Sequence, residues 1–169
     1  MLASGQVTKR NGNYMPQAAN MVKLKYDCTL EISARDKAAS CSTAENTNRA
    51  YQENAHILLK SNAVDRPDAM RQSVIAWWKQ VRLDEPIGAA VTFRARHANM
   101  AVRSFTRMAW ASTTNMGCAV KSCGDYWYSV CHYSPAGNVI GSQIYLPGTP
   151  CSACPANTRC DYGLSLCVA

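Results

Sequence analysis

Nine cysteines in a chain of 169 residues restrict the fold more than any other feature of this sequence. So many thiols are typical of an oxidising, extracellular compartment and rare in the cytosol. An odd number also leaves one thiol without a partner inside the chain. The sequence therefore predicts a secreted, disulfide-bonded protein. The disulfide candidates are Cys28, Cys41, Cys118, Cys123, Cys131, Cys151, Cys154, Cys160 and Cys167.

The length fits one domain with a hydrophobic core of its own. Hydrophobic residues make up 47% of the chain, which argues against disorder. No apolar run is long enough to span a bilayer, so no membrane span is expected. The first ten residues lack the n-region and h-region of a signal peptide, and we expect an upstream segment to be missing.

Apolar residues at helical spacing predict helices over residues 17–41, with a break near 26–27, and over residues 67–82. Trp77 and Trp78 in the second helix are interpreted as core residues rather than a ligand platform. The segment up to Pro16 is predicted to be a loop.

Beyond Gly117 the apolar period changes to two. Residues 119–121 and 126–133 flank a Gly-Asp turn and predict an antiparallel hairpin. A further strand is predicted over residues 139–145. Residues 147–169 carry four cysteines and few apolar residues, so disulfides are expected to hold this tail together. A zinc knuckle or a redox pair is the alternative for those cysteines.

The middle of the chain is cationic, since residues 86–124 contain no acidic residue and the net charge is +7. Arg94, Arg96, Arg103 and Arg107 form a candidate patch for a polyanion such as a heparin-like glycan. The alternative is an ordinary solvated surface, and nucleic acid is not expected as a partner.

Sequence motifs of catalysis are missing. Three histidines occur, at positions 56, 97 and 132, outside any zinc-protease, nucleophile-elbow, phosphate-loop or calcium-loop motif. We therefore predict no catalytic residue, no cofactor and no enzyme activity.

Two segments resemble the signatures of the CAP superfamily, which joins cysteine-rich secretory proteins, venom antigens and pathogenesis-related proteins. They are residues 103–113, RSFTRMAWAST, and residues 130–138, VCHYSPAGN. Further short matches in the same order resemble the activation-associated secreted, or venom allergen-like, proteins of parasitic nematodes. Those matches include Trp77-Trp78, Gly117-Cys118 and the Cys151-x-x-Cys154 tail.

This resemblance implies an α+β fold, a three-layer α-β-α sandwich, with a CAP domain over residues 1–146. A Cys-rich, hinge-like extension follows over residues 147–169. The first helix of the family is expected to be absent from this sequence, together with a further cysteine.

The family also carries a cleft with two histidines and two glutamates that binds a divalent metal in some members. Carried over by position, Glu31 and Glu53 match the glutamates, whereas Ser104 stands at the signature histidine. Because imidazole is the usual nitrogen ligand of zinc, we predict no metal site. His132, within the second signature, is expected to be structural.

The function implied is that of a non-enzymatic excretory-secretory protein that acts in host interaction or immune modulation. Its partner would be a host protein or a glycan. One alternative is a carrier of sterol or fatty acid. A weaker alternative is a residual hydrolase that uses Ser104. Some family members dimerise, so a homodimer is left open.

Overall fold

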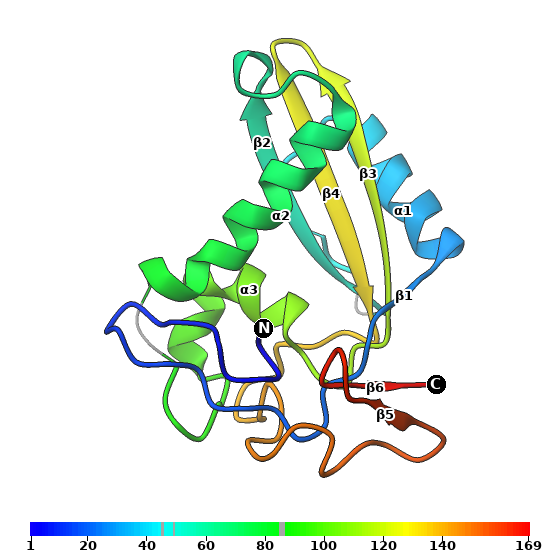
Figure 1. The fold of residues 1–169 in the computed structure, drawn as a ribbon. Coiled ribbons are helices and arrows are strands. Elements are labelled where there is room, and N and C mark those ends of the chain that lie inside the picture. The colour runs from blue at the N-terminus through cyan, green and yellow to red at the C-terminus, as the bar shows by residue number, and fades with distance from the viewer. Residues whose placement is uncertain (45, 49, 85–86) are drawn as a thin grey trace.

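A four-stranded mixed sheet forms the middle of the molecule in the computed structural model, which describes residues 1–44, 46–48, 50–84 and 87–169 (Figure 1). The strand order is β1-β3-β4-β2. β1 runs parallel to β3, and the other neighbours are antiparallel. The strands are β1 (Lys25–Tyr26), β2 (Gln52–Leu59), β3 (Asn115–Cys123) and β4 (Tyr126–Ser134).

Helices cover both faces of this sheet. α1 (Cys28–Ala39) packs on β3 and β4, whereas α2 (Arg66–Leu83) and α3 (Val102–Met108) lie across the sheet from it (Figure 1). Two short 3₁₀ helices, η1 (Lys60–Asn62) and η2 (Ala95–Asn99), connect these elements. The predicted three-layer α-β-α sandwich is confirmed. No described helix is long and apolar enough to span a membrane.

α1 lies so close to β3 that only glycine fits at the contact. A Cβ atom on Gly117 would lie 2.1 Å from the backbone nitrogen of Glu31. α1 begins where Asp27 caps it, because the Asp27 carboxylate accepts from the backbone of Thr29 and Leu30.

The predicted helix over residues 17–41 is wrong in its first half. Helical structure covers only Cys28–Ala39, and the described residues before it form no helix. The earlier backbone groups are bonded to distant segments instead: Ala19 donates to Leu146, and Lys23 donates to Cys167. Tertiary pairing therefore replaces the helix that the apolar spacing predicted.

The helix predicted over residues 67–82 is confirmed by α2, which begins one residue earlier, at Arg66, with Asp65 as its N-cap. Trp77 is buried against the sheet. Trp78 packs edge-on against Phe105, with ring centroids 4.9 Å apart. Both tryptophans are therefore packing residues, as expected.

The predicted hairpin is confirmed by β3 and β4, which turn at Gly124 and Asp125. The strand predicted over residues 139–145 is wrong. This segment makes one isolated bridge, between Gln143 and Thr92, and threads between loops to bury Ile144. Val139 and Ile140 are exposed and Ile144 and Tyr145 are both buried, so burial does not alternate here as it would in a half-buried strand.

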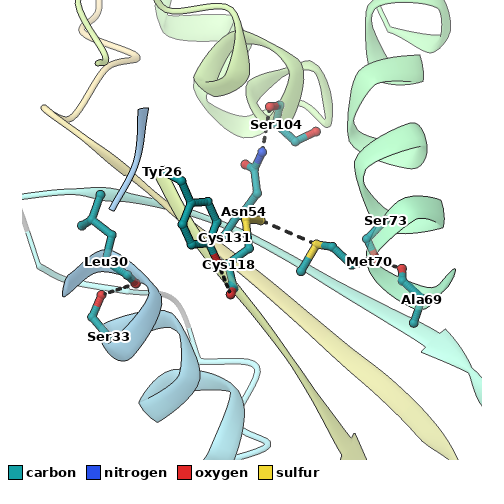
Figure 2. The surroundings of a disulfide bond; sticks show 10 residues. All are labelled: Tyr26, Leu30, Ser33, Asn54, Ala69, Met70, Ser73, Ser104, Cys118 and Cys131. Carbon is teal, nitrogen blue, oxygen red and sulfur yellow. Dashed lines mark hydrogen bonds between the residues drawn. A yellow bond between two sulfur atoms is a disulfide. The ribbon is translucent and has the colours of Figure 1, made fainter. Parts of the chain in front are cut away.

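Four disulfides form. Cys41–Cys123 ties the end of α1 to the end of β3, and Cys118–Cys131 joins facing residues of β3 and β4 (Figure 2). Cys151–Cys160 and Cys154–Cys167 hold the tail, which forms a small hairpin of β5 (Arg159–Asp161) and β6 (Leu166–Val168). The structural interpretation of the tail cysteines is confirmed, because sulfurs in disulfides are not thiolate ligands.

Cys28 was expected among the disulfide candidates and is not bonded to another cysteine. It is the first residue of α1 and its side chain is exposed. It is the remaining ninth thiol.

Candidate functional site

A cleft of about 850 Å³ lies along β2, the edge strand of the sheet. The residues before β2 form one wall and α3 contributes to the other. Most of its lining residues carry a polar group, and these groups are amides, hydroxyls, a carboxylate, an imidazole and guanidiniums. The lining residues are Thr43, Asn46, Thr47, Asn48, Tyr51, Gln52, Glu53, Ala55, His56, Ile57, Arg103, Arg107, Tyr128 and Ala136.

Glu53 is hydrogen-bonded inside the protein. Its Oε2 lies 3.0 Å from Nε2 of His132, the residue directly opposite it in the β2–β4 pair. The other ring nitrogen of His132 lies 2.6 Å from Oγ of Ser33 on α1. The Tyr51 ring stacks on the imidazole with ring centroids 4.1 Å apart. One hydrogen-bonded chain thus connects α1, β4 and β2.

A serine, a histidine and a glutamate hydrogen-bonded in this order also make up a catalytic triad. The surroundings of these three residues differ from those of an active site. Ser33 lies within α1, and its hydroxyl is within hydrogen-bond distance of both the Leu30 carbonyl and Nδ1 of His132, so its one proton serves only one of them at a time. The His132 side chain is 1% exposed and that of Glu53 9% exposed. A substrate needs open access to the hydroxyl and to the base, so burial favours a structural network.

His56 enters the cleft from β2 as a neutral imidazole. Burial lowers its pKa below the usual value. Its Nδ1 lies 3.0 Å from Oγ of Ser73 on α2, and that hydroxyl donates to the Ala69 carbonyl. Since the serine proton is already used, Nδ1 is the donor in this contact.

Two arginines of the predicted cationic patch, Arg103 and Arg107, line the cleft one helical turn apart on α3. Arg107 donates to the carbonyl of Glu53. Two residues further along β2, the carbonyl of Ala55 accepts from the indole N–H of Trp77. The edge of β2 is therefore partly covered by side chains, which hinders pairing with another strand.

Of the other two arginines of the patch, Arg94 is the N-cap of η2 and Arg96 lies within η2, and neither is among the lining residues. The four positions therefore divide between the cleft and a separate loop.

The three positions carried over from the resemblance are not brought together. Only Glu53 lines the cleft. The Glu31 side chain is exposed on α1, near the Tyr26 hydroxyl. The pKa of Tyr26 is raised, mainly by desolvation and secondly by this carboxylate. Ser104 donates through its hydroxyl to Ala101 and accepts through its carbonyl from Asn54, 2.9 Å away (Figure 2).

Sequence reasoning missed His56, Tyr51 and Tyr128 as cleft residues. Strand β2 itself was not predicted, because its polarity is reversed: Asn54 is 1% exposed, whereas Ile57 is 46% exposed. Polar and apolar residues alternate only over residues 54–57 of QENAHILL, which is too short a signal to indicate the strand or which of its faces is buried.

Comparison with known proteins defines the class. The model of the cysteine-rich secretory protein family, CAP, matches residues 9–133. This chain belongs to the CAP family.

Among individual relatives, Ancylostoma secreted protein of Ancylostoma caninum is 32% identical over 94% of this chain. The chain spans 38% of that relative's length. The solved structure of BmVAL-1 is 31% identical, has a TM-score of 0.91, and is matched over 99% of this chain and 86% of its own. NaASP2, solved with Zn²⁺, is 31% identical with a TM-score of 0.90, over 98% and 86% of the two chains.

The zinc of NaASP2 raises the question of whether this chain fits the same ion. Among the described residues, one group of three potential metal-ligating side chains lies close enough to share an ion. It consists of Cys151, Cys154 and Cys167, all bonded in disulfides. No other group of three such side chains occurs in the described part of the cleft, where Glu53 accepts from His132 through Oε2. The described residues of the cleft therefore do not fit zinc.

Proposed function

We propose that this chain is a secreted, non-enzymatic CAP protein that works by binding host molecules, in host interaction or immune modulation. The observation that carries the proposal is the cleft along β2. It is polar and contains two arginines, and the serine–imidazole–carboxylate chain beside it is buried. Four disulfides and a relative named as a secreted protein support an extracellular location.

An anionic glycan is the partner class that this lining fits best. Guanidinium groups bind sulfate and carboxylate groups through paired hydrogen bonds. The Tyr51 ring and the amides of Asn46 and Asn48 add surfaces that suit a sugar. The alternative partner is a host protein with an acidic loop.

The proposal is tested by binding to an immobilised heparin oligosaccharide, with Arg103→Glu as the cleft variant. Arg35→Glu is the matched control, because Arg35 is exposed on α1 beside Asp36 and lies outside the cleft lining. We expect Arg103→Glu to weaken binding about tenfold, as for the loss of a hydrogen bond to a charged group. Arg35→Glu should bind like the parent. Equal loss in both variants, or no binding by the parent, would contradict the proposal.

A carrier of apolar lipid is the second candidate, and a specific pocket favours it. A space of about 400 Å³ lies between the first residues of the chain, residues 21–24, α2, α3 and the tail hairpin. Its lining is apolar and includes Trp78, Met108 and Leu166, with Lys23 as a cation. Mass spectrometry of an organic extract of the purified protein tests this function, since a carrier should yield bound lipid. An empty extract removes it.

A further inference from the structure

The Glu53 carboxylate is largely buried and therefore needs a hydrogen-bonding partner inside the protein. It is 9% exposed, and a buried carboxylate is costly unless it is hydrogen-bonded and paired. In a metal-binding relative the ion can supply that partner. Here the partner is His132, whose Nε2 lies 3.0 Å from Oε2.

The position of His132 is fixed from three sides. It pairs with Glu53 in the register of β2 and β4, Ser33 of α1 contacts its Nδ1, and Tyr51 stacks on its ring. These contacts hold Nε2 against the carboxylate. An imidazole fixed in this way orients Glu53 as an outer-sphere partner orients a metal ligand.

We propose that His132 replaces a metal ion as the partner of Glu53, so that Glu53 and His132 are positioning residues of the cleft wall and not ligands. The Nε2–H of His132 donates to Oε2 of Glu53 and its Nδ1 contacts Ser33, so neither ring nitrogen of His132 is offered to zinc as a ligand beside the carboxylate. This goes beyond the proposed function, because it holds whatever molecule the cleft binds.

The ¹⁵N spectrum of the histidine side chains tests the assignment in the unmodified protein. We expect Nε2 of His132 to carry a proton at neutral pH and to stay protonated, with an unchanged shift, when zinc chloride is added. An unprotonated Nε2, or a zinc-dependent shift of that nitrogen, would overturn the proposal. This measurement needs no variant that risks unfolding.

A matched pair of substitutions tests the positioning role. His132→Gln can place an amide N–H near the position of Nε2, whereas the shorter side chain of His132→Asn cannot reach Glu53. We expect His132→Asn to lower the Tm by roughly 6 °C or more, and His132→Gln to recover about half of that loss. Equal losses would show that only ring packing matters and would overturn the proposal. So would a rise in the parent's Tm with zinc that Glu53→Gln removes.

Discussion

At the scale of single residues, the cleft shows how burial decides the charge of a side chain. His56 is half-buried between β2 and α2, where Trp77 packs edge-on to its ring with the ring centroids 6.5 Å apart. Desolvation disfavours the imidazolium form, which lowers the pKa of His56. No local pattern singles out this histidine, since its partner Ser73 is 17 residues away in the chain.

The lowered pKa of His56 predicts a pH-dependent loss of stability. In the unfolded state His56 binds a proton near pH 6.5, whereas in the folded state it does so at lower pH. The contribution of His56 to the free energy of unfolding is therefore complete above about pH 6.5. That contribution is lost as the pH falls through the lowered value. Denaturant unfolding of the parent and of His56→Gln checks this: between about pH 7.5 and pH 5 the parent should lose more stability than the variant. A larger loss in the variant would contradict the account.

The two serines near the cleft are expected to be unreactive. Ser33 is bonded within α1 and contacts a buried imidazole, and the Ser104 hydroxyl donates to a backbone carbonyl. We predict no covalent labelling by a fluorophosphonate probe at neutral pH, read by intact mass, with a known serine hydrolase as the positive control. Labelling at Ser104 or Ser33 would restore the hydrolase alternative.

At the scale of elements, the sequence predicted those whose partners are close in the chain. α2 and the β3–β4 hairpin follow from local spacing and turn residues. Residues 17–26, 52–59 and 139–145 were missed or misassigned, because their backbone partners lie far away: Lys25, for example, donates to Thr114. Local periodicity contains no information about such pairs.

The packing of α1 on β3 gives a sharp prediction for Gly117. A methyl group there meets backbone atoms of Leu30 and Glu31 at 2.5 Å and 2.1 Å, which cannot move without displacing α1. Gly117→Ala should lower the free energy of unfolding by about 3 kcal/mol, measured by urea denaturation. Gly88→Ala is the control, because nothing lies within 4 Å of its added Cβ, and it should unfold like the parent. Equal stability of the two variants would mean that α1 is placed wrongly.

At the scale of the whole molecule, two short motifs were enough to predict the family and the layered fold. They could not show the cleft, since Glu31, Glu53 and Ser104 were aligned by position and only Glu53 lines it. The contact that matters most, between His132 and Glu53, involves a residue inside a well-matched motif. Its consequence depends on strand register and therefore became visible only in three dimensions.

The four disulfides predict the thiol count of the folded chain. Alkylation of the native protein without reduction should add one label, and peptide mapping should place it on Cys28, the exposed thiol at the start of α1. Cys28→Ser should take up no label and keep the parent's Tm. Labels on other cysteines would contradict the pairings described above.

We propose that this CAP cleft acts by binding and holds no zinc, since its carboxylate Glu53 is paired with His132. Calorimetric titration of the purified protein with zinc at neutral pH tests it most directly, with Ser104→His titrated in parallel. The account predicts no binding heat in the parent and none in the variant, since an added imidazole leaves Glu53 engaged. Micromolar or tighter zinc binding by the parent would contradict the account.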